Sequence, residues 1–119
     1  MRLRLLLAAS ALAATPALAQ DDARFAELLV RSRASAGYGP VRVRAELGTH
    51  GLDRDAIATS LDESGEDWSA NARLLVRRRF GAEVAQDRAL QRRAADFLIR
   101  RGFTADQIHD AIRLEPADP

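Results

Sequence analysis

A run of eleven residues limits the folds open to this chain, because it is typical of a tight turn followed by a short helix. Residues 37–47 read Gly-Tyr-Gly-Pro-Val-Arg-Val-Arg-Ala-Glu-Leu, and Gly51-Leu52-Asp53 follow shortly after. Glycine suits a turn, since it adopts backbone conformations closed to other residues. Pro40 suits the first helical position, where no backbone N–H is needed. Gly51 ends the predicted helix and Asp53 caps the next one, so the run predicts a helical module.

Apolar residues recur with the spacing of a helix face over the rest of the chain, and the pattern predicts six short helices. We expect them at about 23–34, from Pro40 to a stop at 48–51, from the Asp53 cap, at 67–80, at 87–101 and from the Thr104 cap. Their expected inward-facing residues are Phe25, Leu28, Leu29 and Ser32, then Pro40, Val43 and Leu47, then Ile57 and Leu61, then Trp68, Ala72, Leu75 and Val76, and then Leu90, Ala94, Phe97 and Leu98.

Two helix starts carry specific end patterns. Thr104 with Gln107 predicts a capping box, and Leu52–Ile57 and Phe103–Ile108 each predict a hydrophobic staple across a helix start. On the outer face of the second helix, Arg42 and Glu46 are four residues apart and are expected to pair.

The two halves of the chain repeat one another. Residues 28–33 match residues 74–79 at an offset of 46, and Leu47, Gly51, Leu52, Asp55 and Ile57 match residues at an offset of 51. A longer loop at 81–86 would absorb the difference. Each half is therefore a three-helix unit whose apolar face needs a neighbour. We predict an all-α fold of two tandem three-helix repeats in a short curved rod, divided into a leader (1–19), repeat A (20–65), repeat B (66–115) and a tail (116–119).

Charge is distributed unevenly along the chain, although the net charge is only +1. Residues 73–101 hold nine arginines and three acids, whereas residues 53–67 hold six acids and one arginine. Every one of the 18 basic residues is an arginine, the side chain better suited to bidentate contact with phosphate or carboxylate. This density of positive charge suits contact with phosphates or with acidic protein loops. For any single arginine, a solvated helix surface with intrahelical pairs such as Arg92–Asp96 and Asp96–Arg100 explains the pattern equally well.

Nothing in the sequence predicts an enzyme. His50 and His109 have no histidine or cysteine at metal-ligand spacing, and the chain has no cysteine at all. No phosphate-binding glycine loop, nucleophile elbow or HExxH helix occurs. Acidic pairs such as Asp62-Glu63 lie at predicted helix ends, where capping and helix-dipole effects explain them. We therefore expect no catalytic residues, no metal site and no cofactor.

Motifs on both sides of the first run add a family resemblance. Upstream stand Asp21-Asp22-Ala23-Arg24-Phe25-Ala26 and Val30-Arg31-Ser32-Arg33, and downstream stand Arg77-Arg78-Arg79-Phe80-Gly81 and Leu98-Ile99-Arg100-Arg101-Gly102-Phe103. In their order and spacing over about residues 20–114, these motifs resemble the RecX family of regulatory proteins, which modulate the RecA recombinase. The resemblance implies tandem three-helix repeats, with one more repeat usually present before the segment that starts at Asp21.

The resemblance also implies a function and a set of contacts. RecX proteins lie along the groove of the RecA–single-stranded DNA filament, bridge neighbouring subunits, and restrain the recombinase, ATPase and coprotease activities in DNA repair and the SOS response. The arginines expected to bind the partner or its nucleic acid are Arg42, Arg44, Arg77, Arg78, Arg79, Arg93 and Arg100. The turn residues Gly37, Tyr38, Gly39 and Pro40 are expected to set the helix orientation, with Tyr38 packing over the turn.

The first 19 residues conflict with the cytoplasmic location that a RecA modulator needs. Arg2 and Arg4 precede an apolar run too short to span a bilayer, and Ala17-Leu18-Ala19 resembles a signal-peptide cleavage site. A misassigned start, a truncation with an apolar leader and true export all remain open. Two other functions are also open: a small exported helical binding protein of the cell envelope, and a general DNA-binding module independent of RecA.

Overall fold

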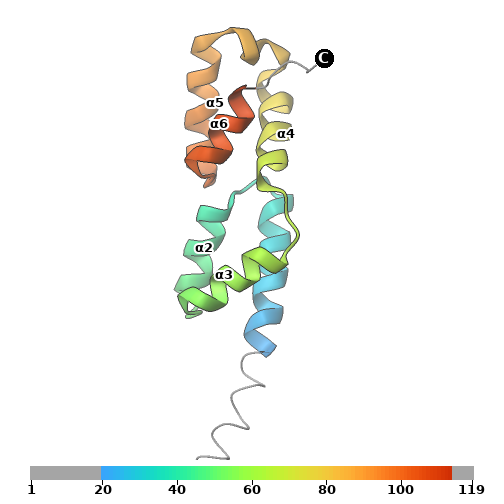
Figure 1. Ribbon diagram of the computed structural model, residues 1–119, viewed down its shortest axis with the longest axis vertical. Helices are drawn as coiled ribbons and strands as arrows, with labels where there is room; N and C mark the ends of the chain where they lie inside the picture. The colour runs from blue at the N-terminus through green and yellow to red at the C-terminus, as the bar shows by residue number, and fades with distance from the viewer. Residues whose placement is uncertain (1–19, 114–119) are drawn as a thin grey trace, which may run out of the picture.

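The computed structural model describes residues 20–113, and this part of the chain is elongated and consists of helices joined by short turns (Figure 1). The N-terminal helix covers residues 20–35 of the described range. It is followed by α2 (Pro40–Thr49), α3 (Arg54–Glu63), α4 (Trp68–Phe80), the 3₁₀ helix η1 (Ala82–Gln86), α5 (Arg88–Arg101) and α6 (Ala105–Arg113). The prediction of an all-α stack of two three-helix units is confirmed. The leader and the tail lie outside the described residues.

Each three-helix unit has its own apolar core, and the two cores use matching positions. Ala26 and Val30 of the N-terminal helix are buried, as are Ala72 and Val76 of α4, 46 residues later. The buried residues Leu47, Leu52 and Ile57 correspond to the buried residues Leu98, Phe103 and Ile108 at the offset of 51. Trp68 is partly buried and packs against both cores. The two units therefore share one aromatic side chain where they meet.

The predicted helix caps form with good geometry. The Asp53 carboxylate accepts a hydrogen bond from the Ala56 N–H at 2.8 Å. In the capping box, the Thr104 N–H donates to the Gln107 side chain at 2.9 Å, and the Gln107 N–H donates to the Thr104 hydroxyl at 3.3 Å. These bonds satisfy N–H groups that a helix start leaves without partners. Asp67 and Asp87, expected as first helical residues, are the N-caps of α4 and α5 instead.

The expected inward face of the N-terminal helix is wrong in part. Leu28 is 57% exposed and Ser32 is also exposed, whereas Ala26 and Val30 are fully buried. The small side chain of Ala26 sits in the same core as Val43 and Leu47 of α2 and Leu61 of α3. The helix therefore turns its alanine inward, as α4 does with Ala72, and this rotation carries Leu28 to the surface. The inward faces expected for α2, α3, α4 and α5 are confirmed.

The segment expected as a longer loop at 81–86 is a 3₁₀ helix of five residues. Its Val84 side chain is fully buried in the second core. The Gln91 side chain of α5 donates to the carbonyl oxygens of Val84 and Ala85 at 3.0 and 3.2 Å. The five residues by which the two repeat offsets differ thus form an ordered addition to the second core.

Candidate functional site

The Gly37–Pro40 turn lies where the two three-helix units meet, beside the α5–α6 turn, and we call this contact the joint. The Gly39 N–H donates to the Arg101 carbonyl at 2.8 Å, and the Val41 N–H donates to the Gly102 carbonyl at 2.8 Å. These two residues are separated from their acceptors by about 60 positions, so the bonds fasten one repeat to the other through the main chain.

Glycine is required at the joint because the two backbones approach very closely. A Cβ atom on Gly39 would lie 2.4 Å from the Gly102 carbonyl oxygen, well inside van der Waals contact. Gly37 has a φ of +89°, which is a backbone conformation that side chains disfavour. Pro40 is buried at the first position of α2, where its missing N–H leaves no donor unpaired. The motif selected from the sequence therefore lies in the contact between repeats.

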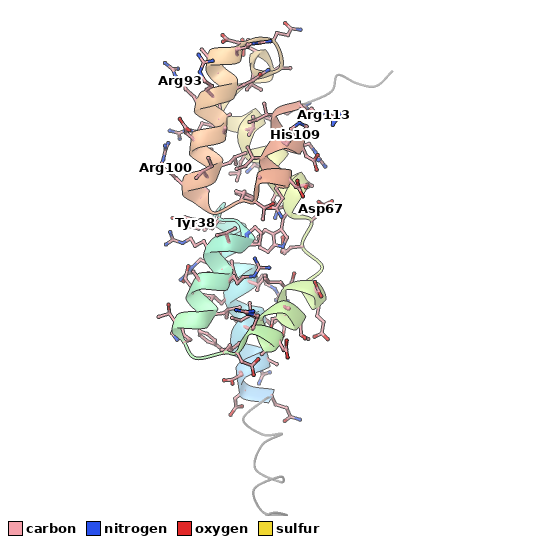
Figure 2. The ribbon with its side chains drawn as sticks, turned by 60° about the vertical axis from the view of Figure 1, so that its left-hand side comes forward. Tyr38, Asp67, Arg93, Arg100, His109 and Arg113 are labelled. Carbon is pink, nitrogen blue, oxygen red and sulfur yellow. The ribbon has the colours of Figure 1, made fainter. Side chains whose placement is uncertain are left out.

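Tyr38 was expected to pack over the turn between the first two helices, and the structure places its ring against Arg42 of α2 and also against Arg101 of α5, across the joint. The guanidinium of Arg42 lies 4.2 Å from the centre of its ring, and that of Arg101 lies 4.9 Å from it. Arg101 also donates to the Ala36 carbonyl at 3.1 Å. Both arginines thus contribute cation–π contacts that tie the turn to its surroundings. Figure 2 shows Tyr38 at the level where the two units meet.

Arg101 was missed as a joint residue, because its partners in the turn lie about 65 positions away and no local pattern links them. In the sequence, Arg101 stood out only as part of the Leu98–Phe103 motif, which indicated a family resemblance and no contact with the turn.

Arg42 and Arg33 both bind Glu46, so the expected Arg42–Glu46 pair belongs to a larger cluster. Arg42 Nε lies 3.1 Å from Glu46 Oε2. Arg33, from the N-terminal helix, grips the same carboxylate through Nε at 2.9 Å and Nη2 at 2.8 Å. The hydrogen bonds from Arg33 hold the pKa of the Glu46 carboxyl below its usual value, with a further contribution from Arg42. The cluster therefore braces the N-terminal helix against α2.

Glu46→Gln is expected to make stability less dependent on acid pH. Because the pKa of Glu46 is lowered by folding, its contribution is present above the unfolded value of about 4.3 and is lost as pH falls through the folded pKa. Urea unfolding at steps between pH 7 and pH 3 should show the variant less stable than the parent chain at pH 7, with the two curves converging toward pH 3. Glu27→Gln, which removes a 3.4 Å exposed pair with Arg31, is the matched control and should change little. Parallel curves for parent and Glu46→Gln would refute the expectation.

The remaining predicted contacts are exposed arginines on three helices. Arg44 lies on α2, Arg77, Arg78 and Arg79 form the last turn of α4, and Arg93 and Arg100 lie on α5. Figure 2 shows Arg93 and Arg100 pointing outward on the same side of α5. Arg79 lies 4.8 Å from the Phe97 ring centre, so its side chain is engaged within the second unit. Of the predicted arginines, Arg42 and Arg79 therefore make contacts within the protein, and the others extend into solvent.

Five of the predicted arginines have no ion-pair partner within residues 20–113: Arg44, Arg77, Arg78, Arg93 and Arg100. The intrahelical pairs Arg92–Asp96 and Asp96–Arg100 are also not formed in that range. Positive charge on α4 and α5 is thus left open to solvent in repeat B, while acidic residues concentrate on and beside α3 in repeat A.

Neither histidine is placed in a reactive setting. His50 is exposed and its ring centre lies 4.6 Å from that of Phe25, and His109 is exposed on α6. In the described part of the chain, no three His, Cys, Asp or Glu side chains gather closely enough to hold a metal ion. None of the described helices has the length and apolar character needed to cross a membrane.

Comparison with known proteins explains the two matching units. Residues 21–61 match the second three-helix domain of RecX, and residues 66–112 match the third. The chain belongs to the RecX family. A regulatory protein RecX of Stenotrophomonas maltophilia (strain R551-3) is 63% identical over 99 residues, which cover 83% of this chain and 61% of that protein. One from Xanthomonas oryzae pv. oryzae (strain MAFF 311018) is 53% identical over 97 residues, 82% of this chain and 61% of the relative.

This chain therefore matches about three fifths of the length of its relatives. The joint lies at the boundary between the two matched domains, since Gly39 falls in the second RecX domain and Gly102 in the third. The close contact of Gly39 with Gly102 is thus one of the contacts that join two RecX domains.

Proposed function

We propose that this RecX-family chain is a regulatory, non-enzymatic protein that binds the RecA filament on single-stranded DNA and restrains its activity. The observation that carries the proposal is the match of both three-helix units, in order, to two successive RecX domains. Relatives at 52–63% identity bear the name regulatory protein RecX. Binding alone would suffice, because a ligand that prefers one state of a filament shifts its population without a cofactor.

The charge layout supports such a partner. Arg44, Arg77, Arg78, Arg93 and Arg100 reach solvent without an ion-pair partner among the described residues, so they can meet phosphates or carboxylates with no internal contact to break first. Arg42 and Arg79 hold the fold together in this structure, so we assign them a supporting role. A rod held by main-chain bonds at its joint can present these arginines at fixed separations to neighbouring subunits.

The decisive assay is hydrolysis of ATP by RecA on single-stranded DNA, with and without the full chain. We expect the chain to lower the rate in a concentration-dependent way, and to bind the filament more tightly than bare DNA. An undiminished rate with a folded chain would refute the proposal. Salt-sensitive DNA binding that RecA does not alter would instead identify a general DNA-binding module.

A cytoplasmic location is part of the proposal, and the signal-like pattern of residues 1–19 favours the competing view of an exported envelope protein. Mass spectrometry of the native N-terminus in separated cell fractions distinguishes them. A chain in the cytoplasmic fraction supports the RecA role. A mature chain that starts at Gln20 in the periplasm would contradict it.

A further inference from the structure

The joint holds two arginines, one from each repeat, against the same aromatic ring. The guanidinium groups of Arg42 and Arg101 lie 4.2 and 4.9 Å from the centre of the Tyr38 ring. Like charges held this close repel one another, and a cation–π contact attracts each guanidinium without neutralising its charge. The ring therefore fixes where the two cations lie and leaves their charge to be balanced by something else.

A single carboxylate balances the arginines of this region. Glu46 accepts hydrogen bonds from Arg33 and from Arg42 Nε, the latter at 3.1 Å. Arg101 has no carboxylate partner in the described part of the chain, and its one hydrogen bond there runs from Nη1 to the neutral Ala36 carbonyl at 3.1 Å. Three guanidinium groups thus share one carboxylate, so an excess of positive charge remains where the repeats meet.

Hydrogen-bond donors that suit an anion are free at the same place. Arg42 uses only its Nε in the fold, so its two terminal nitrogens have no acceptor among the described residues. Arg101 Nε and Nη2 and the Tyr38 hydroxyl likewise have none. The Arg42 side chain is 47% exposed, and Arg101 and Tyr38 are partly exposed. An anion can therefore reach these donors from solvent without breaking a contact of the fold.

We propose that Arg42 and Arg101, together with the Tyr38 hydroxyl, bind a phosphate group that bridges the two repeats at the joint. Guanidinium groups form strong charge-assisted hydrogen bonds with phosphate, whose several oxygens can accept from two arginines at once. The bound phosphate offsets the repulsion between the two cations and so strengthens the joint. A nucleic-acid backbone and a free phosphate compound both offer this group. The site does not depend on the proposed action on RecA.

Inorganic phosphate is the probe, and the melting temperature of the full chain is the measurement. Circular dichroism in sodium phosphate and in sodium chloride of equal ionic strength separates binding from charge screening. Phosphate should raise the melting temperature by roughly 5–10 °C at about ten times its dissociation constant, because a ligand of the folded state stabilises that state. The same melting temperature in both salts would count against the site.

Arg42→Gln and Arg101→Gln should each weaken phosphate binding by about tenfold or more, since each removes a set of charge-assisted hydrogen bonds. Arg101→Gln also loses the bond to Ala36, so the quantity compared between variants is the shift that phosphate produces. Arg92→Gln is the matched control, because Arg92 is exposed on α5 and has no ion pair in the part of the chain that the structure describes. It should retain the affinity of the parent within about twofold.

Phosphate also stabilises folded proteins by its exclusion from their surface, and this general effect is common to all variants. Equal shifts in Arg101→Gln and Arg92→Gln would therefore refute the site. A labelled oligothymidine, followed by fluorescence anisotropy, identifies the source of the phosphate. Binding that Arg101→Gln weakens more than Arg92→Gln, and with which inorganic phosphate competes, supports a nucleic-acid backbone. Equal oligonucleotide binding by the two variants, with the phosphate shift lost only in Arg101→Gln, supports a free phosphate compound.

Discussion

Gly39→Ala is expected to lower the melting temperature of the chain by roughly 5–20 °C, because a single added methyl group overpacks the joint by about 1–3 kcal/mol. Gly39 has an extended backbone with φ of −100°, so alanine meets no conformational penalty there. The effect is purely steric: the new Cβ would lie 2.4 Å from the Gly102 carbonyl oxygen and 2.7 Å from the Phe103 ring. Relief requires the two repeats to separate, which stretches the bonds from Gly39 and Val41 across the joint.

Thermal unfolding followed by circular dichroism measures this loss, and the fluorescence of Trp68 reports on the joint itself, because this is the only tryptophan and it packs on both cores. Gly48→Ala is the matched control. Gly48 lies in α2, and a Cβ there would come no closer than 4.0 Å to Ile57. Alanine at that helical site should leave stability unchanged or raise it by about 0.5–1 kcal/mol. An unchanged melting temperature for Gly39→Ala would show that the joint is not tightly packed.

Removing Arg93 and Arg100 together is expected to weaken binding to the RecA filament by roughly tenfold at 0.1 M salt. Both arginines point outward on the same side of α5 (Figure 2), and neither has an ion pair within the described residues. Their replacement by alanine therefore removes charge without leaving a carboxylate unpaired. Filament affinity measured between 0.05 and 0.2 M salt should also show a shallower salt dependence, with the slope reduced by about 0.7 for each lost phosphate contact.

Arg24→Ala with Arg54→Ala removes the same amount of charge from exposed positions in repeat A, and serves as the comparison. This pair should alter filament affinity by no more than about twofold, because its loss reduces only the long-range electrostatic attraction between the chain and the filament. An equal loss from both double variants would mean that only the net charge matters. A loss from Arg93 and Arg100 with an unchanged salt slope would indicate carboxylates of the protein, in place of phosphates, as their partners.

Features that depend on a few neighbouring residues could be predicted from the sequence. The Asp53 cap and the Thr104–Gln107 capping box involve partners three residues apart, and the Arg42–Glu46 pair involves partners four apart. Such geometry follows from the helix itself. The three-helix units could be predicted as well, because matching apolar residues recur at constant offsets.

Features that depend on distant residues could not be predicted. Arg33 donates hydrogen bonds to Glu46, which lies 13 positions later in the sequence. Gly39 and Gly102, which are in close contact, are 63 positions apart. The exposure of Leu28 could not be predicted from the spacing of apolar residues, because Leu28 and Val30 both fit an apolar helix face. The packing of Ala26 into the core sets the rotation of the helix, which buries Val30 and exposes Leu28. The buried Val84 lay in a segment with loop-like composition, where a 3₁₀ helix leaves little periodic pattern.

Trp68, which packs on both cores, has a mechanical consequence. Bending between the two units would draw its indole out of one apolar cluster or force it into the other, and either movement costs contact area. The indole therefore adds to the main-chain hydrogen bonds of the joint in resisting a change of angle between the two units, and the molecule behaves as one stiff rod. A rigid rod of constant length fits a helical filament of only one pitch. Its affinity for such a filament should therefore depend on how far the filament is extended.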